Sequence, residues 1–140
     1  LAPGQLKIVP AGPGAASDVL TAGISRYSGA GGLIFSWPNG STSVEPGTAD
    51  ALAADFVVTV HVGSADETLE VGSCGHADPT IRCTDESYSL NITASGASIV
   101  APRVYGALYA LETFAQLVEH TAGVPTPYTV YATCVCRFCM

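Results

Sequence analysis

Three cysteines near the end of the chain, Cys134, Cys136 and Cys139, have a spacing that could bind a metal ion. Three thiolates together with a histidine, either His120 or His76, would supply the four ligands of a tetrahedral zinc site. The sequence offers neither the second Cys-x-x-Cys pair nor the paired histidines that usually complete such a module. We therefore interpret the three cysteines as a cysteine-rich tail, and we expect neither a metal ion nor another cofactor.

Two adjacent acidic pairs, Asp66-Glu67 and Asp85-Glu86, could in principle supply the carboxylates of a hydrolase. A general acid needs an enclosed pocket that raises its pKa, and the sequence around neither pair indicates such a pocket. The glycine-rich segment 29–32 lacks the lysine of a phosphate-binding loop. We therefore predict structural roles for both acidic pairs and name no catalytic residue.

Cysteine and asparagine positions bear on the compartment in which the chain folds. Cys74 and Cys83 bracket a short loop, and a disulfide between them would contribute about 2–3 kcal/mol. N-glycosylation sequons occur at Asn39 and Asn91. Together these features favour the secretory pathway, with the lysosome, the vacuole or the cell exterior as destination. The sequence leaves open whether either asparagine carries a glycan.

Composition limits the classes of function. The 140 residues fit one domain, and 48% hydrophobic against 12% charged residues is typical of a packed globule. A net charge of −7 with five scattered basic residues excludes an extended nucleic-acid surface. Because no apolar stretch reaches about 18 residues, we predict no transmembrane segment. The chain starts with Leu1 and its sole methionine is Met140, so a removed signal peptide, a fragment, a splice form and a true short protein all stay open.

The elements of the first half are predicted from hydrophobic periodicity. A short strand at Leu6–Val9 precedes a helix that begins at Ser17 or Asp18 and ends before the glycines that follow Tyr27. The clearest strand is Phe56–Val62, which has valines on both faces. We therefore expect this strand to be covered on both sides, or nearly so.

The second half predicts a hairpin followed by a long helix. Apolar and polar residues alternate in Tyr88–Thr93, which places Asn91 on the outer side, and Ser98–Ala101 returns as the partner strand. The helix is predicted from Pro102 to His120. Its apolar surface is wide enough for two packing partners, its own sheet and a neighbouring domain. The alternative is a two-layer domain with a generously apolar helix.

Three segments carry a resemblance to a known family: Asp85–Leu90 (DESYSL), Val104–Leu108 (VYGAL) and Leu111–Leu117 (LETFAQL). In this order and spacing they resemble the N-terminal domain of the eukaryotic-type β-N-acetylhexosaminidases of glycoside hydrolase family 20. The resemblance extends from Ile8 to Glu119.

The resemblance implies a zincin-like α+β fold, a two-layer sandwich of a mainly antiparallel sheet with two helices packed on one face. It also implies that the domain braces a following (β/α)₈ barrel, through which the enzyme could also dimerise. In the family, that barrel removes terminal N-acetylhexosamine from glycoconjugates or chitin oligomers, with the acetamido oxygen of the substrate as nucleophile. A barrel needs at least about 200 residues, so these 140 residues cannot contain one, and we predict no activity for them alone.

We assign residues 1–130 to this N-terminal domain and residues 131–140 to a divergent cysteine-rich tail, because the family continues differently at that point. Residues of the shared segments are predicted to pack the domain or its contact with the barrel. They are Tyr88, Gly106, Leu108, Leu111, Glu112, Phe114 and Leu117.

Three functions of different classes follow from the sequence. The first is a structural, non-catalytic domain of a glycosidase. The second is a free-standing secreted binding or regulatory protein, derived from such an enzyme, that pairs with full-length subunits. The third is an unrelated small secreted disulfide protein. The shared segments favour the first.

Overall fold

The computed structural model describes residues 5–28, 32–34, 55–67, 85–120, 128–130 and 133–138. The elements follow in the order β1 (Leu6–Ala11), the 3₁₀ helix η2 (Pro13–Ala16), α1 (Asp18–Tyr27), β2 (Phe56–Val62), β3 (Tyr88–Thr93), β4 (Gly96–Ala101), α2 (Val104–Gln116), β5 (Val118–His120), β6 (Tyr128–Val130) and β7 (Thr133–Phe138). Within these ranges, no helix has the length and apolar character needed to cross a membrane.

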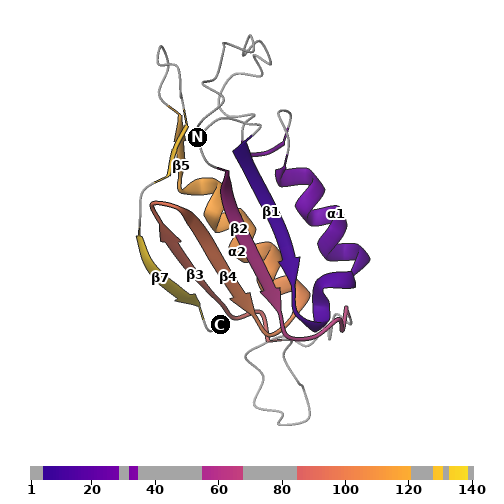
Figure 1. The fold of residues 1–140 in the computed structure, drawn as a ribbon. Helices are drawn as coiled ribbons and strands as arrows, with labels where there is room; N and C mark the ends of the chain where they lie inside the picture. The colour runs from indigo at the N-terminus through magenta and orange to yellow at the C-terminus, as the bar shows by residue number, and fades with distance from the viewer. Residues whose placement is uncertain are drawn as a thin grey trace.

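Five strands form the main sheet, in the order β1-β2-β4-β3-β7. The strand pairs β1–β2 and β2–β4 are parallel, whereas β3–β4 and β3–β7 are antiparallel. Strands β5 and β6 form a separate antiparallel pair. Both α1 and α2 lie on the same side of the main sheet (Figure 1). The predicted α+β fold of two layers is therefore confirmed, and its sheet is of the mixed kind.

Strand β2 has the bounds predicted for it, but it is covered on one face only. Val58, Val60 and Val62 are fully buried, while Thr59 and His61 on the opposite face are exposed. The expectation of cover on both sides was wrong, because both helices pack on the same face of the sheet. A valine on an exposed face of a strand still fits the pleated backbone. Valines on both faces of β2 therefore did not require a covering layer on each side.

Strands β3 and β4 form the predicted hairpin. Tyr88, Leu90 and Ile92 point into the core, and Asn91 is exposed on the outer face, as the alternation predicted. At the turn, the Thr93 hydroxyl donates a hydrogen bond of 2.9 Å to the carbonyl oxygen of Gly96. This contact closes the tight connection between the two strands.

Strand β7 joins the main sheet from the segment that we assigned to a divergent tail. Its backbone pairs with β3, with Leu90 opposite Cys136 and Ile92 opposite Thr133. The register shifts between these two pairs. The domain boundary predicted at residue 130 stays a prediction.

Helix α2 is shorter than predicted at both ends. Arg103 is the N-cap and has extended backbone, so Pro102 lies before the helix and not in its first position. At the other end Leu117 is the C-cap, and residues 118–120 form strand β5 instead of a last helical turn. Pairing with β6, in which Val118 lies opposite Val130, gives the backbone groups of this segment partners outside the helix.

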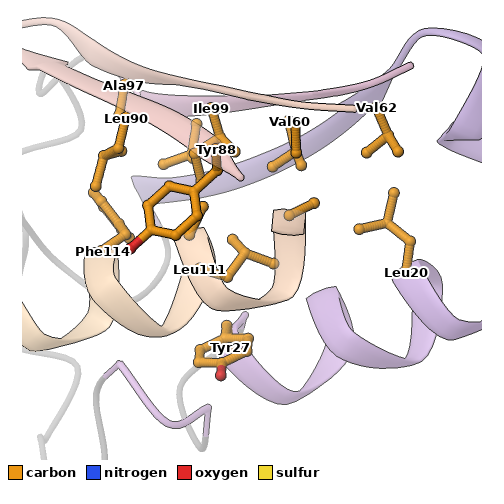
Figure 2. Close-up of a cluster of buried hydrophobic side chains, with 14 of the residues drawn as sticks. Leu20, Tyr27, Val60, Val62, Tyr88, Leu90, Ala97, Ile99, Leu111 and Phe114 are labelled. Atoms are coloured by element: carbon orange, nitrogen blue, oxygen red, sulfur yellow. The ribbon is translucent and has the colours of Figure 1, made fainter. Parts of the chain in front are cut away.

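The hydrophobic core lies between the main sheet and the two helices (Figure 2). Its largest side chains that are almost completely buried are Phe114, Leu20, Leu90, Ile99, Leu111, Val58, Val60, Val62 and Val104. They come from β2, β3 and β4 on the sheet side and from α1 and α2 on the other. Helix α2 and strand β2 each contribute three residues to this set, which explains the apolar sequence of the helix.

Helix α1 is the second packing partner of α2. Besides the residues that face the sheet, α2 buries Ala107 and Ala110 completely, and Leu108 packs against α1 at Gly23. Helix α1 therefore covers part of the apolar surface of α2 for which the sequence left a neighbouring domain or a two-layer fold as alternatives. Tyr109 stays 50% exposed and is the large side chain of α2 that a further partner could still cover.

Helix α1 begins at Asp18, and its N-cap is Ser17, which is one of the two predicted caps. The Ser17 side chain is 4% exposed, and its oxygen accepts a hydrogen bond of 3.0 Å from the backbone N–H of Leu20. The same hydroxyl donates to Glu67 Oε1 at 2.5 Å. Ser17 therefore joins the start of α1 to the segment that follows β2.

We expect Ser17→Ala to lower the free energy of unfolding by about 1–2 kcal/mol, because the first turn loses its cap inside the protein. Denaturant unfolding of the 140-residue chain measures this loss. Ser25→Ala is the matched control, since the exposed Ser25 hydroxyl donates a hydrogen bond to the carbonyl of Ala22 within its own helix. Equal losses for the two variants would contradict the capping role of Ser17.

Candidate functional site

The candidate surface for contact with a partner is the line along which α1 and α2 touch, which we call the helix seam. It comprises Gly23 and Tyr27 of α1 and Leu108 and Glu112 of α2. A Cβ atom at position 23 would overlap Cδ2 of Leu108, so the glycine leaves the space that the leucine fills. Helices pack closely where a small residue on one accepts a large side chain from the other. Gly23 therefore gives the end of the Leu108 side chain its place in the seam.

One partly buried hydrogen bond also joins the two helices. The Tyr27 hydroxyl donates to Glu112 Oε2 at 2.7 Å, and Gln116 Nε2 donates to the other carboxylate oxygen at 3.1 Å. Burial, followed by the bond to Glu112 and the negative charge of Glu112, raises the pKa of Tyr27 to about 12, although Arg26 acts in the opposite direction. Tyr27 thus stays protonated and donates its proton to Glu112 over the whole physiological range.

Tyr27→Phe is expected to lower the free energy of unfolding by about 1–3 kcal/mol at neutral pH, since the bond is to a charged acceptor. The pKa of Tyr27 is higher in the folded chain than the value of about 10 for an unfolded tyrosine. Its contribution is therefore complete below pH 10 and is lost as the pH rises towards 12.

Unfolding of the chain and of Tyr27→Phe, followed from pH 7 to pH 12, tests this expectation. The difference between the two should shrink above pH 10. Tyr109→Phe is the control, because Tyr109 lies half exposed on α2. A difference between the chain and Tyr27→Phe that stays constant up to pH 12 would contradict the link to Glu112.

Beside the seam lies a shallow hollow of about 230 Å³. It is lined by Val19, Ala22, Gly23, Arg26, Tyr27 and Leu108. Apolar groups form most of this lining, and Arg26 supplies the charged side chain. The hollow is smaller than the pockets of about 300–1,000 Å³ that usually hold small ligands, and none of the described residues that line it carries a carboxylate. Such a surface suits a side chain from a packing partner better than a reacting sugar.

Three of the four residues in the acidic pairs, Asp66, Glu67 and Asp85, have partners within the domain. Asp66 pairs with Arg103 at 2.8 Å, and the bond from Ser17, followed by that from the backbone of Val19, lowers the pKa of Glu67.

The hydroxyl and backbone N–H of Ser87 likewise lower the pKa of Asp85, whose Oδ1 accepts the N–H at 3.0 Å. A general acid needs the opposite shift. Glu67 and Asp85 are therefore poorly suited to donate a proton at neutral pH.

The seven residues predicted to pack the domain all take part in contacts within it. Leu111 and Phe114 are fully buried, and the Tyr88 hydroxyl lies 2.7 Å from Thr113 Oγ1. Gly106 packs against the backbone that precedes β3. The remaining members are the seam residues Leu108 and Glu112 and the half-buried Leu117. Their role towards a neighbouring barrel stays a prediction.

Sequence reasoning missed the partners of several of these residues. Tyr27 and Glu112 lie 85 positions apart, and no local pattern indicates that a hydroxyl and a carboxylate meet over such a separation. The pair of Arg103 and Asp66 was missed for the same reason. An amphipathic first helix with a glycine in its apolar face, as at Gly23, was the one available signal for close helix packing.

Several predicted residues lie outside the described ranges, namely Asn39, Cys74, Cys83 and Cys139. Cys134 and Cys136 are described only as backbone positions of β7. The disulfide and the state of the tail therefore stay predictions. In the described part of the chain, no three His, Cys, Asp or Glu side chains are grouped so that they could hold a metal ion.

A family model described as "beta-acetyl hexosaminidase like" matches residues 14–117. The chain belongs to this family. The matched range agrees with the segment on which the family-20 resemblance rested, and it includes the helix seam and the β3–β4 hairpin.

One curated protein and one solved structure are also similar to the chain. Beta-hexosaminidase subunit A1 of Dictyostelium discoideum is 31% identical over 120 residues, which are 81% of this chain and 19% of that protein. The structure of a Flavobacterium johnsoniae chitobiase aligns with a TM-score of 0.52 and 22% identity, over 91% of this chain and 16% of the chitobiase. The second likeness shows the fold, and the chain spans about a fifth of the length of the Dictyostelium protein.

Proposed function

We propose that this domain is a non-catalytic, structural part of a β-N-acetylhexosaminidase. The observation that carries the proposal is the match of residues 14–117 to the hexosaminidase-like family. In this domain Asp66, Glu67 and Asp85 are hydrogen-bonded or ion-paired to residues of the domain itself. The enzyme would remove terminal N-acetylhexosamine from glycoconjugates or chitin oligomers. The names of the Dictyostelium beta-hexosaminidase and the Flavobacterium chitobiase support this class of substrate.

The domain would contact the catalytic barrel through the outer surface of the helix layer, where apolar groups are still exposed. Tyr109 is half exposed on α2, and the shallow hollow beside the seam is largely apolar. Its single guanidinium, from Arg26, can pair with a carboxylate of the partner. A (β/α)₈ barrel carries helices on its outside, and side chains from such helices would fill the hollow.

The secretory pathway is the compartment that fits this function. The Cys74 and Cys83 spacing and the sequons at Asn39 and Asn91 support it. The lysosome, the vacuole and the cell exterior are its three destinations.

Purified chain, assayed with chromogenic N-acetylglucosaminide and N-acetylgalactosaminide, tests the non-catalytic role. We expect no release of chromophore above the background of buffer, while a complete β-hexosaminidase in a parallel assay releases it. Turnover that survives purification and is abolished by Glu67→Gln or Asp85→Asn would overturn the proposal. Those two residues are the described acids whose pKa values the structure holds low.

A further inference from the structure

The face of the main sheet that points away from the helices, which we call the outer sheet face, is open to solvent. Its central row crosses four strands through Val9, Thr59, Ser98 and Asn91, which lie opposite one another in register. All four residues are exposed. Neighbouring strands lie about 4.8 Å apart, so Asn91 stands near one end of a continuous row that reaches the edge strand β1.

The sequon Asn91-Ile92-Thr93 lies within β3. Its three residues alternate between the two faces of the sheet. Ile92 is 3% exposed and belongs to the core, whereas Asn91 and Thr93 are exposed on the outer sheet face. On β4, the residue opposite Asn91 is Ser98, which is small and exposed. A bulky group attached to the Asn91 amide would therefore point to solvent and would leave Ile92 undisturbed in the core.

The outer sheet face also has apolar side chains that such a group would cover. Val9 is 45% exposed in the same row as Asn91, and Val100 is 47% exposed. Val100 is two residues beyond Ser98 on β4, which makes it the diagonal neighbour of Asn91 at about 7–8 Å. Between Asn91 and Val9 this row contains the small side chains of Ser98 and Thr59. No long side chain in the row therefore separates Asn91 from either valine.

We propose that Asn91 carries an N-linked glycan that covers the outer sheet face and keeps this face out of any tight interface with another folded domain. In the transfer, Asn91 Nδ2 forms a bond to C1 of an N-acetylglucosamine residue. The bond from C1 to a phosphate oxygen of a lipid-diphosphate oligosaccharide donor breaks, the amide loses one proton, and the lipid diphosphate leaves. The inference goes beyond the proposed function, because it concerns the face opposite the helix seam and requires no hexosaminidase activity.

The 140-residue chain, secreted from eukaryotic cells behind a signal peptide, tests the modification. Asn39→Gln removes the other sequon and serves as the background for three variants: Asn91→Gln, Thr93→Ala and Thr93→Ser. We expect one glycan in the background chain, none in Asn91→Gln or Thr93→Ala, and one again in Thr93→Ser. Thr93→Ser keeps both the sequon and a hydroxyl that can donate to Gly96, so it separates loss of the sequon from damage to the turn.

Mass spectrometry of the secreted Asn39→Gln chain measures directly whether Asn91 is glycosylated, so the test does not depend on the folding of the other variants. A secreted chain has passed the oligosaccharide-transferring enzyme, so unmodified Asn91 in it would overturn the proposal. Modified Asn91 supports the site, and the cover is then tested at His61, an exposed residue of the outer sheet face opposite Val100.

Diethyl pyrocarbonate should modify His61 several-fold faster after enzymatic removal of the glycan than before. Equal rates would show that the sugar does not cover the face and would overturn that part of the proposal. Neither result depends on hexosaminidase turnover, so the inference and the proposed function can fail separately.

Discussion

Replacement of Phe114 by alanine is expected to lower the free energy of unfolding by about 3–5 kcal/mol, which is a large share of the stability of a domain of this size. Phe114 is fully buried on the sheet side of α2. Its ring stacks on Phe56 of β2, with ring centroids 6.2 Å apart and an angle of 22° between the ring planes. Alanine would leave a cavity that the surrounding strands could close only in part.

Denaturant unfolding of the chain measures this loss. Phe114→Leu is a second variant that keeps most of the volume, with an expected loss of about 1–2 kcal/mol, and it keeps the measurement possible if Phe114→Ala does not fold. Tyr109→Ala is the matched control on the same helix. Since Tyr109 is 50% exposed, its replacement should change the stability by no more than about 0.5 kcal/mol. Similar losses at both positions would contradict the core assigned to α2.

The parts of the fold that could be predicted are those in which one local pattern decides the structure. Strand β2 has the predicted bounds because Phe56–Val62 is an unbroken run of β-formers, and the alternation in β3 placed Asn91 outside correctly. The start of α1 was limited to two residues by its capping chemistry, and Ser17 is the one used. None of these features requires knowledge of a distant segment.

The parts that could not be predicted depend on pairing between distant segments. The last residues assigned to the long helix, Val118 to His120, pair instead with β6, and their own sequence is compatible with either state. The outer side of β2 is exposed because α1 and α2 both pack on the other face of the sheet. The valines of β2 do not indicate on which face the helices pack.

The shared segments supplied two residues of the helix seam, Leu108 and Glu112, but not Gly23 and Tyr27 of α1. Of the seven residues taken from those segments, Tyr88, Gly106, Leu111 and Phe114 are buried and Glu112 is exposed, and their role as a set of domain-packing positions stays a prediction. What each one touches is set by the arrangement of α1 and α2. Tyr27 reaches Glu112 and Gly23 receives Leu108 only when those helices lie side by side.

Gly106 is a position where the addition of a single methyl group should destabilise the domain. A Cβ atom there would lie 2.6 Å from the carbonyl oxygen of Ser87 and 3.0 Å from that of Glu86. Both atoms belong to the backbone that leads into β3, so neither can rotate away as a side chain could. In a helix, alanine is otherwise favoured over glycine by about 1 kcal/mol, and here we expect Gly106→Ala to be less stable than the unmodified chain by about 1–3 kcal/mol.

Gly23→Ala is the matched control for Gly106→Ala, because it makes the same substitution in the other helix. The Cβ atom at position 23 meets the flexible end of Leu108, which can turn aside, and the gain in helix propensity offsets the cost. We therefore expect a change within about 1 kcal/mol at this position, whereas Gly106→Leu should prevent folding. Thermal unfolding of the three variants separates the two sites. A Gly106→Ala chain as stable as the unmodified one would show that α2 does not rest on the backbone before β3, and the close approach of helix and sheet would need another explanation.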